Sequence, residues 1–335
     1  MRIAIVESTH WHMPLYLDAL EAPGLRVVGV TDSARKTGAG LAKRFGCEVY
    51  RDLDELLDTQ AVDLAFVFGR HIDMPTLALK LIARGIPFAI EKPCGMHAID
   101  VDSLVAGAEA KSLYVAVPLI FRLSDTLDIV GHTKTRPDFA SFRFMAGPPS
   151  RYEAAGTPWM LQRELAGGGP LINLGVHFID LFSVLAQDDV ESVSAVSSSE
   201  INGLSVEDVI SLRMVTKQNR ICTIECGYIF PSDKNIQREF TFSIRSPAAY
   251  YVSGDDQILV RSKSIDGQIE TRAVPARLET DVYYPLFVRR VIEEVQAGSA
   301  PVAGLRDASR ALRIVEAAYQ SASRQGMPVQ LSASP

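Results

Sequence analysis

Cysteine is scarce in this sequence, with four residues in a chain of 335, which is too few for a disulfide-stabilised scaffold. Cys222 and Cys226 lie an even number of residues apart on one expected strand, so their side chains share a face and are too distant to form a bridge. These features fit a reducing compartment, and we predict a cytoplasmic protein.

The sequence also lacks a strong charge imbalance and a long apolar run. Its formal net charge is −6, which gives no reason to expect a nucleic acid or an anionic membrane surface as a partner. No apolar run reaches the roughly 20 residues that a membrane-spanning helix needs. The N-terminal residues Met1–Val6 run directly into an expected strand without a small-residue cleavage site, so we expect no signal peptide.

The first part of the chain alternates apolar strand patterns with amphipathic helical patterns. The strand patterns are nearly all apolar, as in a parallel sheet that is covered on both faces. Repeated units of this kind predict a doubly wound sheet in residues 1–120, and such sheets bind ligands at the carboxyl ends of their strands. The expected strands are Arg2–Val6, Val27–Thr31, Val62–Phe68, Ile86–Glu91 and Leu113–Val117, and the expected helices are Pro14–Glu21, Ser33–Phe45, Asp52–Leu57, Pro75–Arg84 and Ile99–Lys111.

The loop after the first strand lacks the glycines of a dinucleotide fingerprint. Glu7, Thr9 and His12 stand at the positions where those glycines would let the backbone approach a pyrophosphate. Ser8 and Thr9 can still offer hydroxyl and amide groups to a phosphate at a helix N-terminus, and we predict that both bind the cofactor.

The same loop carries two histidines around a tryptophan. The pair His10-x-His12 suggests a metal, but no cysteine or carboxylate cluster lies nearby in the sequence, so we predict no metal site. We predict instead that His10 and Trp11 contact the cofactor.

An acidic residue, Asp32, ends the second expected strand. A carboxylate at this position can accept hydrogen bonds from the ribose hydroxyls of NAD. It also suits the N-cap of the helix expected from Ser33, and the two roles are compatible. Arg35 and Lys36 follow and suit the 2′-phosphate of NADP, so NAD is the predicted cofactor and NADP stays open.

Two further strand ends carry polar residues. Gly69, Arg70 and His71 follow the third strand, and we expect them near the cofactor, although a solvated loop histidine is the common alternative for His71. The fourth strand ends in Glu91-Lys92-Pro93. A lysine at a buried strand end is costly unless it is paired, so we expect Lys92 to serve binding or chemistry rather than to be a surface lysine beside a proline turn.

The strand-helix alternation ends after Arg122, and we expect residues 121–335 to form a second domain. Strand patterns dominate residues 191–275, which predicts an open-faced, mostly antiparallel sheet with helices on one face. Such a sheet leaves one face uncovered, and this favours self-association. The expected strands include 138–146, 192–197, 209–214, 221–228, 240–244, 257–261 and 329–331, and the expected helices are 284–296 and 305–323.

A second motif joins three glycines to a helix. Gly167–Pro170 suit a helix start, with the proline near the first helical position. Asn173, His177 and Asp180 then fall at i, i+4 and i+7, on one helical face. For His177 taken alone, the simpler interpretation is a core histidine that is hydrogen-bonded to Asp180. The presence of Lys92 at the strand end instead favours a catalytic role for His177.

These motifs together resemble those of the Gfo/Idh/MocA family, the glucose-fructose oxidoreductase and inositol dehydrogenase group. The resemblance implies an N-terminal Rossmann domain, a C-terminal open-faced sheet domain, NAD(P) as the cofactor, and homodimers or homotetramers built on the second sheet. It covers nearly the full length and rests on Glu91-Lys92-Pro93, Arg122, Gly167–Asp180, Val206-Glu207-Asp208 and Ala317–Ala322.

The resemblance also implies roles for single residues. Lys92 and His177 match the catalytic lysine and histidine of the family. We predict Asn173 as a third catalytic residue, although the family often has an aspartate there and asparagine cannot ionise. The prediction is completed by cofactor contacts from Glu91, Lys92 and Arg122, and by substrate contacts from Lys92, Arg122, Trp159, Asn173 and His177.

The predicted reaction is a hydride transfer between the nicotinamide cofactor and a secondary alcohol. Neutral His177 would take the proton of the hydroxyl group, and Lys92 would stabilise the charge that develops on its oxygen. From the resemblance alone, the substrate is a sugar, polyol, inositol or sugar acid. Two alternatives remain open: a glycoside hydrolase that retains NAD, and a non-enzymatic, cofactor-sensing regulatory protein of the same fold.

Overall fold

The computed structural model describes residues 1–232 and 238–331, and the chain divides into two compact units. The first unit contains Met1–Leu119, Tyr152–Gly167 and Asp281–Arg310. The second contains Ile120–Arg151, Gly168–Thr280 and the chain from Ala311 onward. The sequence pattern suggests one boundary, at residue 120. In the structure, the chain passes from the first unit to the second at this point. It returns to the first unit twice later, and the sequence pattern does not predict these returns.

The first unit is built on a six-stranded sheet in the order β3-β2-β1-β4-β5-β6, and its neighbouring strands are parallel. This order is that of doubly wound dinucleotide-binding sheets, and it confirms the predicted fold class. The central strands are buried on both faces, as their nearly continuous apolar sequences require. The strands are β1 (Arg2–Val6), β2 (Arg26–Thr31), β3 (Glu48–Tyr50), β4 (Leu64–Val67), β5 (Phe88–Ile90) and β6 (Val115–Ala116).

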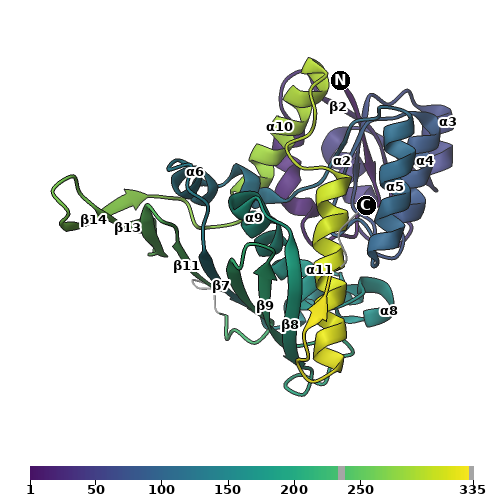
Figure 1. Cartoon of the computed structure of the whole chain (residues 1–335). Helices are drawn as coiled ribbons and strands as arrows, with labels where there is room; N and C mark the ends of the chain where they lie inside the picture. The colour runs from purple at the N-terminus through teal and green to yellow at the C-terminus, as the bar shows by residue number, and fades with distance from the viewer. Residues whose placement is uncertain (233–237, 332–335) are drawn as a thin grey trace. The chain divides into compact units, whose positions relative to one another are not determined.

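Helices connect these strands, and α4 and α5 run side by side (Figure 1). The later segments add two short helices and the longer α10 to the same unit. The helical elements are η1 (Met13–Tyr16), α1 (Leu17–Leu20), α2 (Gly38–Phe45), α3 (Leu53–Thr59), α4 (Met74–Arg84), α5 (Ala98–Ala110), η3 (Pro158–Leu161), α8 (Arg163–Ala166) and α10 (Tyr283–Ala297).

Helix α2 begins at Gly38, not at the expected Ser33, because a carboxylate fixes the backbone that precedes it. Asp32 Oδ2 accepts hydrogen bonds from the backbone N–H groups of Lys36, Thr37 and Gly38 at 2.8, 2.8 and 2.7 Å. The first turn of a helix leaves such N–H groups unpaired, so Asp32 caps the helix several residues later than the sequence suggests.

The second unit contains a nine-stranded sheet in the order β14-β13-β12-β11-β7-β10-β9-β8-β15. Only the pair β10 and β7 is parallel among the described pairs, so the predicted mostly antiparallel sheet is confirmed. The strands are β7 (Phe139–Ala146), β8 (Val190–Ser198), β9 (Val209–Thr216), β10 (Ile221–Gly227), β11 (Arg238–Arg245), β12 (Ala249–Ser253), β13 (Gln257–Lys263), β14 (Ile269–Pro275) and β15 (Val329–Gln330).

The second unit has its helices on one face of this sheet, and α9 lies against it (Figure 1). A π-helical turn, η4 (Leu171–Gly175), precedes α9 (Val176–Ala186), where the sequence suggested one regular helix. Two helices, α7 (Ser150–Ala154) and α11 (Leu305–Ser323), contribute residues to both units. The remaining helices are η2 (Ile120–Leu123) and α6 (Asp125–Gly131).

Phe178 anchors α9 to the second sheet. Its ring is stacked on Phe142 of β7 and Phe240 of β11, with ring centroids 5.3 and 5.4 Å apart. Phe144 contributes a third ring, 5.8 Å away. This apolar contact is made by the residue next to His177, so it also fixes the position of that histidine on the sheet.

The opposite face of the sheet combines charged side chains with exposed apolar ones. Arg143 alternates with Phe142 and Phe144 along β7 and therefore points away from α9. It forms ion pairs with Glu225 of β10 at 2.9 Å and with Glu239 of β11 at 3.3 Å. Charged pairs of this kind make the uncovered face compatible with water.

Within the described chain, one helical stretch has the length and composition of a membrane span. It covers residues 163–186, with a mean hydropathy of 1.5 in its most apolar window, although the sequence shows no uninterrupted apolar run of that length. Of that window, 83% is buried inside the protein. Burial of this extent is typical of a core helix, and the Phe178 contacts account for the apolar sequence.

Two strands, β3 and β14, have no clear signal in the sequence. Strand β3 is three residues long, and β14 is exposed along nearly all of its length. Alternating burial produces the period-two pattern from which strands are predicted, so a short or exposed strand leaves little trace in the sequence.

We predict that Phe178→Ala destabilises the protein by about 3–5 kcal/mol, because the truncation leaves a cavity among the stacked rings. Urea unfolding measures the loss. Ile265→Ala serves as the control, since Ile265 is fully exposed and its truncation should leave the midpoint unchanged. A Phe178→Ala midpoint equal to that of the control would contradict the packing described.

Candidate active site residues

The carboxyl edge of the first sheet holds a cavity of about 420 Å³. It is formed by the residues that follow β1, β2 and β4, together with the segment around η3 that returns to the first unit. Of the predicted cofactor residues, Thr9 and Arg70 line it, and Trp159, predicted to bind substrate, lies on the same wall. The remaining lining residues are Glu7, Ser33, Ala34, Lys36, Asp73, Gly156, Pro158, Gln162 and Leu165.

Glu7 stands in a left-handed conformation, with φ 57°, at the position where the fingerprint has its first glycine. Its carboxylate accepts hydrogen bonds from Ser33 N at 3.0 Å and Ser33 Oγ at 2.6 Å. Its own N–H donates to Thr31 Oγ1 at 2.9 Å. Glu7 therefore ties the end of β1 to the end of β2, and the side chain takes over a positioning role where the fingerprint uses a bare backbone.

The residues around this edge fit an NAD molecule even without the glycine loop. The cavity lies in the size range of small-molecule and cofactor sites, and the cationic Lys36 and Arg70 are on its wall. At the end of β2, Asp32 Oδ1 is buried and has no partner among the described residues. An acceptor oxygen left in this state is suited to a ribose hydroxyl, so the capping role of Oδ2 and the predicted cofactor contact use different atoms.

His10, His71 and Trp159 form a buried ring cluster in the first unit. The His71 and Trp159 centroids are 5.0 Å apart, and His10 lies 5.8 Å from Trp159 and 6.0 Å from His71. Trp159 Nε1 donates to the carbonyl oxygen of Thr9 at 3.1 Å, which fixes the indole against the first loop. The alternative of a solvated loop histidine at position 71 is wrong, since His71 is fully buried, and its predicted cofactor contact stays a prediction.

Both histidines of this cluster are held neutral. Burial lowers the pKa of His71 to about 3, and it lowers the pKa of His10 well below its usual value near 6.5. The positive charge of Lys92 lowers both further. His71 Nδ1 donates to the carbonyl oxygen of Ala166 at 2.7 Å, so its Nε2 carries the lone pair.

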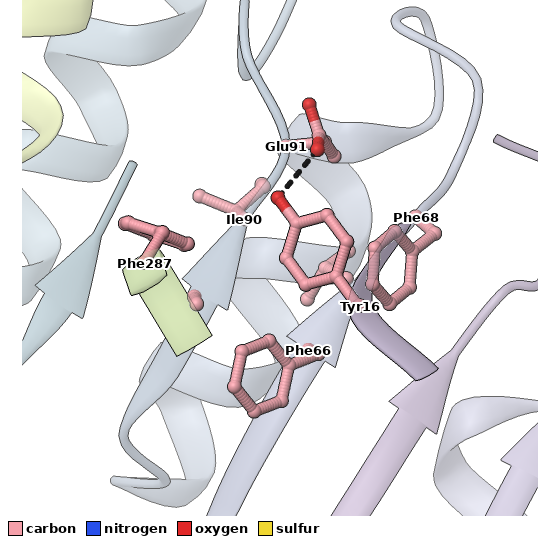
Figure 2. Close-up of a pocket in the computed structure, with 8 residues that line it drawn as sticks. Tyr16, Phe66, Phe68, Ile90, Glu91 and Phe287 are labelled. Atoms are coloured by element: carbon pink, nitrogen blue, oxygen red, sulfur yellow. Dashed lines mark hydrogen bonds between the residues drawn. The ribbon is translucent and has the colours of Figure 1, made fainter. Parts of the chain in front are cut away.

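Glu91 and Lys92 are both buried at the end of β5, with exposed fractions of 2% and 0%. The Tyr16 hydroxyl points at the Glu91 carboxylate and donates to Oε1 at 2.5 Å (Figure 2). His12 Nδ1 lies 3.2 Å from Oε2, and the Tyr284 hydroxyl lies 3.1 Å from the same nitrogen. Glu91 thus has a polar contact on each oxygen within the first unit.

The other residues predicted to bind the cofactor in the first unit differ in their surroundings. Ser8 is buried, and its hydroxyl lies 2.6 Å from Thr37 Oγ1. Trp11 packs edge-on against Tyr152, with centroids 5.2 Å apart. Arg35 is exposed. A Cβ atom added at Gly69 would lie 2.8 Å from Leu77 Cδ1, so Gly69 lies close against the side chains of α4.

In the second unit, His177 is buried near the start of α9, with Phe121 at a centroid distance of 6.1 Å. Asn173 precedes it in the π-helical turn and donates from Nδ2 to the Tyr228 hydroxyl at 2.9 Å. Asp180 accepts two hydrogen bonds from Arg122, at 2.9 and 2.7 Å. This bidentate ion pair gives Arg122 a structural role in addition to its predicted contacts with cofactor and substrate.

The buried carboxylate of Glu207 holds the glycine turn before α9. In the sequence, Glu207 stands out only as part of a family motif, and no role is predicted for it. Glu207 accepts hydrogen bonds from Gly169 N at 2.9 Å, Leu171 N at 3.1 Å and the Tyr319 hydroxyl at 2.9 Å. A Cβ atom at Gly168 would meet that hydroxyl at 2.0 Å. The turn therefore needs glycine because the capping groups approach its backbone closely.

Several residues of these sites carry no local sequence signal. Tyr16, Tyr228 and Tyr284 meet their partners across long separations in the chain, and a buried tyrosine resembles any core aromatic. Glu7 is the exception. Glu7 is charged, directly follows a buried strand and stands where the fingerprint has a glycine, so the sequence alone marks it as unusual.

We predict that Glu207→Gln changes how stability depends on pH. Burial raises the pKa of Glu207 above its usual value near 4.5. The carboxyl group of Glu207 therefore binds its proton more tightly in the folded protein than in the unfolded chain. The folded protein loses stability as the pH rises through the raised pKa. The variant lacks this dependence. The difference in unfolding free energy, wild type minus variant, should therefore shrink as the pH rises above 4.5 in urea unfolding. A difference that grows with pH would contradict the assignment.

Two family models match the chain. The model described as "Oxidoreductase family, NAD-binding Rossmann fold" matches residues 7–119, and the Gfo/Idh/MocA C-terminal domain model matches residues 138–252. Between them they cover more than half of the chain.

Relatives and solved structures agree with these matches. The chain is 24% identical over 315 residues to a D-apiose dehydrogenase of Paraburkholderia graminis, covering 90% of this chain and 81% of that protein. An Agrobacterium radiobacter oxidoreductase, solved with NAD⁺, L-tartaric acid and magnesium, superposes with a TM-score of 0.84 at 16% identity and 98% coverage of each chain. Myo-inositol 2-dehydrogenase from Lactobacillus plantarum gives a TM-score of 0.82 at 16% identity and 99% coverage of each chain.

At these identities the solved structures establish the fold, and the two family models add the NAD-binding character of the first unit. The chain belongs to the Gfo/Idh/MocA family of NAD-binding oxidoreductases.

Proposed function

We propose that this protein is an NAD-dependent dehydrogenase that acts on a secondary alcohol of a sugar, polyol, inositol or sugar acid. Family membership supports the reaction class. The names of the relatives support the substrate class, since they include a D-apiose dehydrogenase and a myo-inositol 2-dehydrogenase. The observation that carries the proposal is the burial of His177 and of Lys92, since a lysine is almost never fully buried unless it is paired.

His177 is the proposed general base. A buried imidazole on a helix that is anchored by Phe178 has a fixed position, which proton transfer requires. Its unprotonated form takes the proton of the substrate hydroxyl. Asn173 is the proposed partner of the substrate, because it lies one helical turn before His177 and its side-chain amide is oriented by the Tyr228 hydroxyl.

Lys92 is the proposed electrostatic group. Its ammonium donates a hydrogen bond and positive charge to the substrate oxygen as the proton leaves. Burial makes this charge more effective than it would be in water, because the local dielectric is low. When bound, NAD would supply the hydride acceptor for the carbinol carbon.

The cofactor contacts are proposed for the first unit. Thr9, Lys36, Arg70 and Trp159 on the cavity wall would hold NAD, with Asp32 Oδ1 as the acceptor for a ribose hydroxyl. NADP stays open, since Lys36 also suits its 2′-phosphate. The buried Arg122–Asp180 pair would orient α9 and, with it, His177.

Assembly and compartment belong to the same proposal. We infer a homodimer or homotetramer through the second sheet, whose uncovered face carries the ion pairs of Arg143 and could match a second copy. A cytoplasmic setting is supported by four free cysteines.

We predict that His177→Ala lowers turnover by about 10²- to 10⁴-fold, the range expected for loss of a general base. The measurement is NADH formation with NAD⁺ across a panel of sugars, polyols, inositols and sugar acids, followed by kinetics on the best substrate. His132→Ala is the matched control, because His132 is exposed in the same unit and its loss should leave turnover unchanged.

Lys92→Met and the double variant extend this test. If both groups act on one oxygen, the double variant should lose much less than the product of the two single losses. Turnover of His177→Ala within a few fold of wild type would reject the proposed base. Tightly retained NAD with no net NADH formation on any substrate would favour the hydrolase that keeps its cofactor.

A further inference from the structure

His10, His12 and Glu91 come together in the first unit although they are distant in the sequence. The two histidines lie in the loop after β1, and Glu91 ends β5. One ligand atom from each lies within 4.8 Å of the others. All three side chains are buried, with exposed fractions of 2%, 7% and 2%. No cysteine or carboxylate cluster lies near His10 and His12 along the chain, and the fold brings the carboxylate of Glu91 to them from the end of β5.

We propose that these three residues bind a divalent transition-metal ion, with Zn²⁺ the best match. Two imidazoles and a carboxylate form a donor set that suits zinc and its neighbours in the first transition row. Magnesium and calcium prefer oxygen donors throughout, so a site with two nitrogen ligands disfavours them. Three protein ligands leave the fourth tetrahedral position to water or another small ligand.

The ligand atoms must come closer together to share one ion. Zinc lies about 2.0–2.2 Å from nitrogen and oxygen ligands, so two ligand atoms of a tetrahedral site are about 3.3–3.6 Å apart. His12 Nδ1 and Glu91 Oε2 are already 3.2 Å apart. A pair near the 4.8 Å limit needs a side-chain movement of about 1.2–1.5 Å. Rotation about the side-chain bonds of Glu91 or His12 supplies such a movement without a change in the backbone.

His10 is the ligand whose surroundings point most directly to an ion. Its Nε2 is buried and has no partner in the part of the chain that the structure describes. Its Nδ1 accepts a hydrogen bond from His12 N at 3.2 Å. Coordination through Nε2 moves the ring proton to Nδ1 and gives up this long bond. In exchange, it satisfies a polar atom that would otherwise stay unpaired in the interior.

The other two ligands are already oriented by tyrosine hydroxyls. Tyr16 donates to Glu91 Oε1 (Figure 2). His12 Nδ1 lies 3.2 Å from the other oxygen, Oε2. The Tyr284 hydroxyl lies 3.1 Å from His12 Nδ1 and 3.2 Å from its Nε2. Metal ligands are commonly held in this way by a second layer of hydrogen bonds, which fixes the ring and the carboxylate before the ion arrives.

An ion at this position would join the loop after β1 to the end of β5. Glu7, Thr9 and His12 replace the glycines that normally keep this loop compact, and a metal crosslink offers a different means of fixing it. The proposed role is structural, and it does not depend on the proposed dehydrogenase reaction.

We predict that the full-length protein, prepared without a polyhistidine tag and dialysed after exposure to ZnCl₂, retains about one zinc per chain by elemental mass spectrometry. His10→Ala and His12→Ala should each lower the retained zinc by about tenfold or more. His71→Asn is the matched control, because His71 lies beside the cluster and outside the ligand set, and asparagine can keep the donor to Ala166 O. This control should retain zinc as wild type does.

A second measurement uses the wild-type protein alone and does not require the variants to fold. Added Zn²⁺ should raise its melting temperature, and a chelator should lower it again, since an ion that binds only the folded state stabilises it. Cobalt substitution should give the visible absorption of a tetrahedral site. Zinc at background level, with neither a thermal shift nor cobalt bands, would overturn the proposal and leave a buried hydrogen-bond network. Equal zinc loss in His71→Asn and His12→Ala would also overturn it.

Discussion

The burial of two charged residues in succession, Glu91 and Lys92 at the end of β5, is the constraint on which the first unit depends. Removing a carboxylate and an ammonium from water costs several kcal/mol each unless partners replace the solvent. Tyr16 and His12 meet Glu91 for this reason, and Tyr284 joins them from the segment that returns late in the chain. The interleaving of the chain in this unit is thus tied to the need to satisfy one strand end.

The second unit uses buried charge in the same way. Glu207 holds the glycine turn before α9, and the Arg122–Asp180 pair holds the helix itself. Phe178 adds the apolar contact to the sheet. In each unit, a residue that is proposed to act on substrate stands next to a segment that buried hydrogen bonds hold in place. Lys92 follows Glu91 at the end of β5, and His177 follows the glycine turn that Glu207 holds. Such rigidity is what acid-base and electrostatic catalysis require, because misplaced groups lose most of their effect.

Much of the fold follows from local patterns, and most of the site does not. Strand β1 and helix α11 match their expected limits, because their burial gives continuous or periodic apolar sequence. Helix α2 starts later than expected because the Asp32 carboxylate bonds to N–H groups further along. The partners of Glu91 could not be foreseen, since contacts across 75 or more residues leave no local trace. The roles of Lys92 and His177 came from motif resemblance and stay predictions.

The central claim is that the strand-end cavity binds NAD although the glycine fingerprint is absent. Calorimetric titration of the protein with NADH tests it most directly, with Ala34→Phe as the variant that fills the cavity and Ala61→Phe as an exposed control outside the cavity wall. The account predicts saturable binding to wild type and to the control, and binding at least about tenfold weaker to Ala34→Phe, because the added ring occupies space that the ligand needs. Absence of binding to wild type, or equal affinity in all three proteins, would contradict it.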